Sequence, residues 1–104
     1  MSFDISDPSS PVLLSQLEWD EPWSPHWISI EPGGRRVVLT SGTGATRTKV
    51  LLINLNSETG EMTFDESFRD RGSEDIGVEF DRSSWPHGEA GPAKPHGTVF
   101  SGVR

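Results

Sequence analysis

Three histidines are the residues of this 104-residue chain whose type and spacing best suit them to bind a metal. They are His26, His87 and His96, and each directly follows a proline. Imidazole nitrogen is a good ligand for copper and zinc, so histidines that converge on one point form a candidate metal site. Their spacing lacks the close pairing that marks a zinc motif. The alternative is a structural role, in which each ring bonds a backbone carbonyl or an ordered water.

Two of the histidines occupy equivalent places in a repeated pattern. Pro25-His26 precedes Ile28-Ser29-Ile30, and 70 positions later Pro95-His96 precedes Thr98-Val99-Phe100-Ser101. If both segments are strands of one repeating architecture, the two rings lie at the same end of neighbouring strands. His87, nine residues before His96, belongs to a loop that can fold over the same place.

Four short apolar runs closed by turns lie between residues 27 and 64, and the first of them follows Pro25-His26. The runs are Trp27–Ile30, Arg36–Thr40, Lys49–Leu55 and Met62–Phe64. Pro32-Gly33-Gly34 and Ser57–Gly60 supply two of the turns. Runs of this kind predict an antiparallel meander, and four such strands in order form one blade of a β-propeller. We therefore expect an all-β chain in which residues 24–68 are a complete four-stranded blade.

The flanking segments predict parts of the neighbouring blades. Residues 3–17 hold two apolar runs around an Asp/Pro/Ser turn, and Ile5 lies 50 positions before Leu55. A repeat of about 40–50 residues is typical of propellers, so residues 3–17 are expected to be the outer strands of one blade. Residues 95–101 are then the inner strand of a further blade. Residues 69–94 form a long loop between the complete blade and this further strand.

Tryptophans lie in both segments that flank the predicted blade, the one before it and the loop 69–94 after it. Trp19 and Trp23 lie in the acidic segment before the predicted blade, where we expect them to wedge between blades. The alternative is a stacking platform for a small-molecule ligand at the mouth of the propeller channel. In the loop 69–94, Val78 alternates with acids and predicts a short strand, and Trp85 is the expected anchor of the loop against the blade.

Charge and composition narrow the partners. The chain carries 16 Asp and Glu against 9 Lys and Arg, a formal charge of −7, which argues against nucleic acid and anionic membranes. No apolar run approaches the length of a membrane span, and residues 1–4 do not resemble a signal peptide. We expect a soluble protein, cytoplasmic if Met1 is the true start. Because a lone blade leaves its sheet faces bare, its expected partners are the remaining propeller blades or further copies of itself.

With the strands placed, the segment PHWISIEPGGRRVVLTS resembles the inner hairpin of YVTN-type and lactonase-like propellers. The order of parts over residues 24–101 resembles the C-terminal end of the selenium-binding protein (methanethiol oxidase) family. The matching features are a TGEM turn, a long loop, Gly91-Pro92-Ala93 and a histidine at position 96. This resemblance implies a seven-bladed propeller and a copper enzyme with histidine ligands, among which His96 is the best match.

Three hypotheses for function follow. The first is a propeller fragment that contributes to a metal or small-molecule site at the channel mouth, in the manner of a copper-dependent oxidoreductase. It predicts that His26, His87 and His96 approach one point. The second is a non-catalytic propeller scaffold for protein–protein interaction, with the histidines pointing apart. The third is a lactonase-like hydrolase, for which the sequence singles out no residues.

Overall fold

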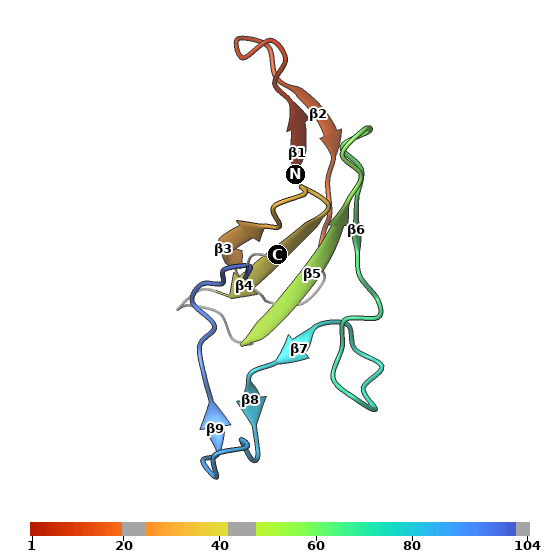
Figure 1. Ribbon diagram of the computed structural model, residues 1–104. Helices are drawn as coiled ribbons and strands as arrows, with labels where there is room; N and C mark the ends of the chain where they lie inside the picture. Colours follow the sequence, from red (N-terminus) through yellow and green to blue (C-terminus); the bar gives the residue numbers. More distant parts are fainter. Residues whose placement is uncertain (20–24, 42–47, 102–104) are drawn as a thin grey trace.

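The computed structural model describes residues 1–19, 25–41 and 48–101, and within these ranges regular structure is entirely β. No helix is present there, so none is long and apolar enough to cross a membrane. The strands form three antiparallel sheets (Figure 1). Their bounds are β1 Ser2–Asp4, β2 Val12–Ser15, β3 Pro25–Ile30, β4 Arg36–Ser41, β5 Lys49–Leu55, β6 Met62–Phe64, β7 Val78–Glu79, β8 Asp81–Arg82 and β9 Gly91–Pro92.

The main sheet is the meander expected from the four apolar runs, with strand order β3-β4-β5-β6. β5 is the longest strand of this sheet. Along one edge it pairs with β7 at Lys49 and Val50 and with β6 at Ile53 to Leu55. The predicted all-β class with antiparallel sheets is confirmed. The assignment of this meander to a propeller blade stays a prediction.

Of the segments outside the four-stranded meander, some form the strands that the sequence predicts and one does not. Residues 3–17 contain the hairpin of β1 and β2, as the two apolar runs predict. The loop 69–94 includes β7, at the place where Val78 predicts a strand, and a small hairpin of β8 and β9. Residues 95–101 form no regular strand, contrary to expectation, and run beside β3 and β4 as an irregular segment. The membership of 3–17 and 95–101 in neighbouring blades stays a prediction.

Strand register gives the main sheet two different faces, because neighbours along a strand point to opposite sides. We call one of them the apolar face, since its side chains are aliphatic, aromatic or thioether except at one end, where alternation along β4 and β5 also places Ser41 and Lys49. Its apolar residues are Ile28, Ile30, Val37, Leu39, Leu51, Ile53, Leu55, Met62 and Phe64. The opposite or mixed face consists of Trp27, Ser29, Arg36, Val38, Thr40, Val50, Leu52, Asn54 and Thr63.

Little of this sheet is buried. The buried apolar residues in the described ranges are Val37, Val50, Leu51 and Ile53, all on the two central strands β4 and β5. On β3, by contrast, Ile28 is 62% exposed. The radius of gyration is 15.4 Å, whereas a compact chain of this length has about 13 Å. The sheet therefore stands largely open, with a core confined to its centre.

Candidate functional site

A β-bulge at the start of β3 determines where His26 points. The register of β3 against β4 shifts between Pro25 and Trp27. Pro25 and Ile28 line the same cavity on the apolar face although three positions separate them, an odd spacing that regular alternation forbids. The extra residue of the bulge is His26, and bulges commonly re-aim a side chain in this way. His26 is thereby released from the apolar face.

The C-terminal segment crosses the mixed face and carries His96. The Ser29 hydroxyl donates a hydrogen bond to the carbonyl of Thr98, and the Thr40 hydroxyl donates to the carbonyl of His96 at 3.4 Å. A Cβ built on Gly97 would lie 3.6 Å from the Trp27 indole, so the segment packs closely on that ring. Since these three partners on β3 and β4 belong to the mixed face, residues 96–98 cover that face over the inner two strands.

The two segments bring His26 and His96 together. Their ring centroids lie 4.7 Å apart with an interplanar angle of 27°, a stacked arrangement. Both residues are exposed, so a metal can reach the rings from solvent. Two ligand nitrogens on a tetrahedral metal at about 2.0–2.1 Å lie about 3.4 Å apart, a separation that stacked rings reach by tilting toward each other. In the stacked pair the nitrogen lone pairs lie in two ring planes only 27° apart, so binding one metal ion requires the rings to tilt toward each other.

His87 has different neighbours. Its Nε2 lies 3.2 Å from a carboxylate oxygen of Glu89, and its ring stacks at 6.4 Å on Trp85. Trp85 in turn packs at 5.7 Å on Phe80 and donates a hydrogen bond of 3.0 Å to the carbonyl of Gly91. These contacts of Trp85 lie in or next to the β8–β9 hairpin, so they hold that hairpin closed rather than anchoring the loop on the main sheet.

Within residues 1–19, 25–41 and 48–101, no group of three or more His, Cys, Asp or Glu side chains could hold a metal ion. The structure thus brings two of the three predicted histidines together, and the metal assignment itself stays a prediction. The repeat of Pro-His at positions 25 and 95 is the signal that predicts this pair. The bulge that frees His26 has no comparable signal.

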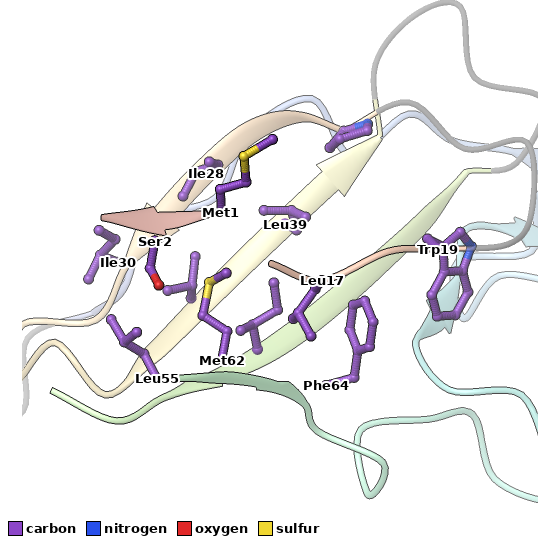
Figure 2. Close-up of a pocket in the computed structure, with 13 residues that line it drawn as sticks. Met1, Ser2, Leu17, Trp19, Ile28, Ile30, Leu39, Leu55, Met62 and Phe64 are labelled. Atoms are coloured by element: carbon purple, nitrogen blue, oxygen red, sulfur yellow. The ribbon is translucent and has the colours of Figure 1, made fainter. Parts of the chain in front are cut away.

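A second candidate site is a cavity of about 550 Å³ on the apolar face (Figure 2). Its floor is the main sheet, and its rim is the N-terminal segment, which contributes Met1, Ser2, Leu17 and Trp19. Figure 2 shows Met1 near Ile28 and Leu39, and Trp19 beside Phe64 at the other end. No side chain that lines the cavity is charged, which suits an apolar occupant.

Trp19 has a defined role at this rim. Its ring meets Phe64 edge-on at 5.3 Å, and the ammonium of Lys49 lies 5.4 Å from its centroid. Lys49 itself is only 2% exposed, so its side chain lies buried over an aromatic face. Trp19 therefore packs on the main sheet, and its expected role as a wedge between blades stays a prediction. Trp23 lies outside the described residues.

Asp70 is a polar anchor that sequence reasoning missed. One of its carboxylate oxygens accepts a hydrogen bond of 2.9 Å from the Glu79 backbone N–H, and the other pairs with Arg82 at 2.8 Å. These bonds tie the start of the loop 69–94 to β7 and β8. Among many acids in this region, no spacing distinguishes Asp70, so only the fold identifies it.

Comparison with protein-family models, with curated proteins and with solved structures finds no match. The likeness to the selenium-binding protein family therefore stays a resemblance carried by the segments described above.

Proposed function

We propose that this chain is a segment of a β-propeller that contributes a two-histidine metal site, His26 with His96, at the start of an inner strand. The observation that carries the proposal is the stacking of these two rings at 4.7 Å. Two exposed imidazoles from segments 70 positions apart meet because a bulge aims one and the C-terminal segment delivers the other. Both lie at the same end of the β3–β4 hairpin.

Copper is the metal that the resemblance suggests, and imidazole nitrogens are suitable ligands for it. A copper ion held there would supply one-electron redox chemistry, as in the copper-dependent oxidoreductases of the family. The chain's own contribution is to position two neutral nitrogen ligands and to leave the remaining coordination positions open to water, to a small-molecule substrate or to another part of the assembly. An enzyme of that kind would be the larger protein, with this segment as part of its site.

Metal titration tests this proposal with a matched control inside the chain. We expect the 104-residue chain to bind one Cu²⁺, measured by calorimetry and by the nitrogen hyperfine pattern in electron paramagnetic resonance. His26→Ala and His96→Ala should each weaken binding by at least about tenfold, about 1.4 kcal/mol. His87→Ala should leave it unchanged, because His87 lies beside Glu89 and Trp85 instead.

Unchanged binding in both His26→Ala and His96→Ala would refute the site. Equal losses in all three variants would show instead that histidines bind copper without regard to their position. Circular dichroism of each variant checks that the β structure is retained.

A non-catalytic scaffold is the second candidate, and the exposure of the apolar face favours it. Monomeric soluble proteins rarely leave a contiguous apolar patch of this kind without a partner. Of the described residues, none is arranged in a way that favours the lactonase-like hydrolase over these two functions.

A further inference from the structure

The turn between β3 and β4 is closed by backbone hydrogen bonds. The Glu31 N–H donates to the carbonyl of Arg36 at 2.9 Å, and the Gly34 N–H donates to the carbonyl of Glu31 at 2.8 Å. The carbonyl of Arg35 accepts a hydrogen bond of 2.7 Å from the Leu55 N–H, which ties the turn to β5. The backbone that carries Arg35 and Arg36 is therefore held in place.

A pocket of about 500 Å³ lies against this turn. We call it the turn pocket, and it is lined by residues 31–33, Arg35, Arg36, Phe100 and Ser101. The C-terminal segment reaches the turn because it runs along β3, from the His26 ring to the Ser29 hydroxyl and on to Phe100. The volume lies within the range of small-molecule sites, about 300–1,000 Å³.

The two arginines of the turn pocket differ in how their charge is used. The Arg36 guanidinium is held by Glu31, with its Nε donating to one carboxylate oxygen at 3.0 Å and its Nη2 to the other at 2.7 Å. These bonds lower the pKa of Glu31, to which the charge of Arg35 contributes less. Arg35 is exposed, and within residues 1–19, 25–41 and 48–101 its guanidinium makes no hydrogen bond or ion pair. Two guanidinium groups and one carboxylate give the pocket a net positive charge, on a chain whose formal charge is −7.

We propose that the turn pocket binds a small molecule that carries a carboxylate or phosphate group on an aromatic or aliphatic body. A guanidinium presents a fork of N–H donors that matches two oxygens of either group. Arg35 supplies this fork, because Glu31 already engages Arg36. Phe100 supplies an apolar surface for the body of the ligand, and the Ser101 hydroxyl is a further donor at the rim.

Charge selects a small anion over a polyanion. Nucleic acid and anionic membranes are bound by several cations acting together, whereas the turn pocket offers one guanidinium that is not already paired. The site lies at the opposite end of β3 from His26 and His96, so it goes beyond the proposed function and does not depend on metal binding.

Titration with benzoate tests the proposal, with acetate as the matching anion that lacks a body and phenyl phosphate as the matching phosphate. We expect benzoate to shift the amide resonances of Gly33, Gly34 and Ser101 and to bind more tightly than acetate. Arg35→Gln should weaken benzoate binding roughly fivefold or more, because it removes charge-assisted hydrogen bonds. Arg71→Gln is the control, since it removes the same charge from an exposed arginine outside the turn pocket and should leave binding unchanged.

Glu31→Gln should act in the opposite direction. It removes the carboxylate that holds Arg36, so a second guanidinium becomes available and benzoate should bind about twofold more tightly or better. Loss of structure cannot produce tighter binding, so this variant separates a role in the site from a role in the fold. Circular dichroism checks that each variant keeps the β signal of the parent.

A parent chain that binds neither benzoate nor phenyl phosphate overturns the proposal. So does an equal loss in Arg35→Gln and Arg71→Gln, because that result indicates attraction by charge without a site. Acetate that binds as tightly as benzoate removes the role of Phe100 and also overturns it. Preference for phenyl phosphate or for benzoate identifies which of the two anionic groups the ligand carries. All of these titrations are made without copper, so their failure is distinguishable from failure of the histidine site.

Discussion

Gly77 is the position at which a single methyl group should do most damage to this fold. It is buried, its φ is +89°, and its N–H donates a hydrogen bond of 2.6 Å to the carbonyl of Phe68. A Cβ built there would lie 2.6 Å from Leu51 Cδ2 and 2.8 Å from the carbonyl oxygen of Val50. The carbonyl belongs to the strand that pairs with β7, so relief of this contact requires movement of backbone.

Gly72 provides a matched control for Gly77→Ala. Its φ is +79°, and a Cβ there would meet nothing within 4 Å. Both alanine variants carry the cost of a left-handed residue, about 1–2 kcal/mol. Only Gly77→Ala adds overpacking, typically about 1–3 kcal/mol. We therefore expect Gly77→Ala to lower the free energy of unfolding by about 1–3 kcal/mol more than Gly72→Ala does.

Urea denaturation followed by circular dichroism measures this difference, with both variants compared at the same low protein concentration. A domain of about 100 residues has a total stability of about 5–15 kcal/mol, so the expected loss is a large share of it. Equal midpoints for the two glycine variants would mean that the β5–β7 contact is absent in solution, and the reasoning would fail.

Two further predictions concern the core and the acidic turns. Leu51→Ala should lower the free energy of unfolding by about 2–5 kcal/mol, because Leu51 is 1% exposed. Ile30 is 59% exposed, so Ile30→Ala should lower it by roughly 1 kcal/mol or less in the same denaturation assay. Similar losses in the two variants would mean that Ile30 is covered. Hydrogen bonds from Ser67 lower the pKa of Asp65, bonds from Ser6 lower that of Asp4, and bonds from Arg36 lower that of Glu31. A pKa lowered by folding stabilises the fold above the unfolded value and loses that contribution as pH falls through the folded value, so the urea midpoint should drop below about pH 4. Asp65→Asn should reduce this dependence, and an unchanged pH profile in that variant would contradict the assignment.

Strand positions were predictable because β-branched and apolar runs bounded by Gly, Pro and Asn leave the chain few alternatives. The run at Lys49–Leu55 forms β5, and the alternation at Met62 and Phe64 forms β6, as expected. Residues 95–101 do not form the expected strand, and the reason is physical. Its carbonyls accept hydrogen bonds from side chains on the mixed face, Ser29 and Thr40, and no strand in the described part of the chain pairs with it to form a ladder.

The candidate site was predictable only in part. The repeated Pro-His pattern points to His26 and His96, and the structure stacks their rings. His87 lies in a small hairpin that depends on Trp85 and Glu89, contacts that no periodicity in the sequence predicts. The burial of Lys49 depends on Trp19, thirty positions earlier, folding back across the sheet, which no local pattern around Lys49 predicts. Features set by long-range contacts of this kind are invisible to local patterns.

Burial in this sheet follows from what lies over each residue rather than from hydrophobicity. Ile53 and Ile30 belong to the same apolar face, yet Ile53 is 5% exposed and Ile30 is 59% exposed. Ile53 has neighbouring strands on both edges and the N-terminal segment nearby, whereas Ile30 lies on the edge strand β3. Because burial of one such side chain contributes about 1.5–3 kcal/mol, a layer over Ile28 and Ile30 would stabilise both the sheet and whatever provides the layer.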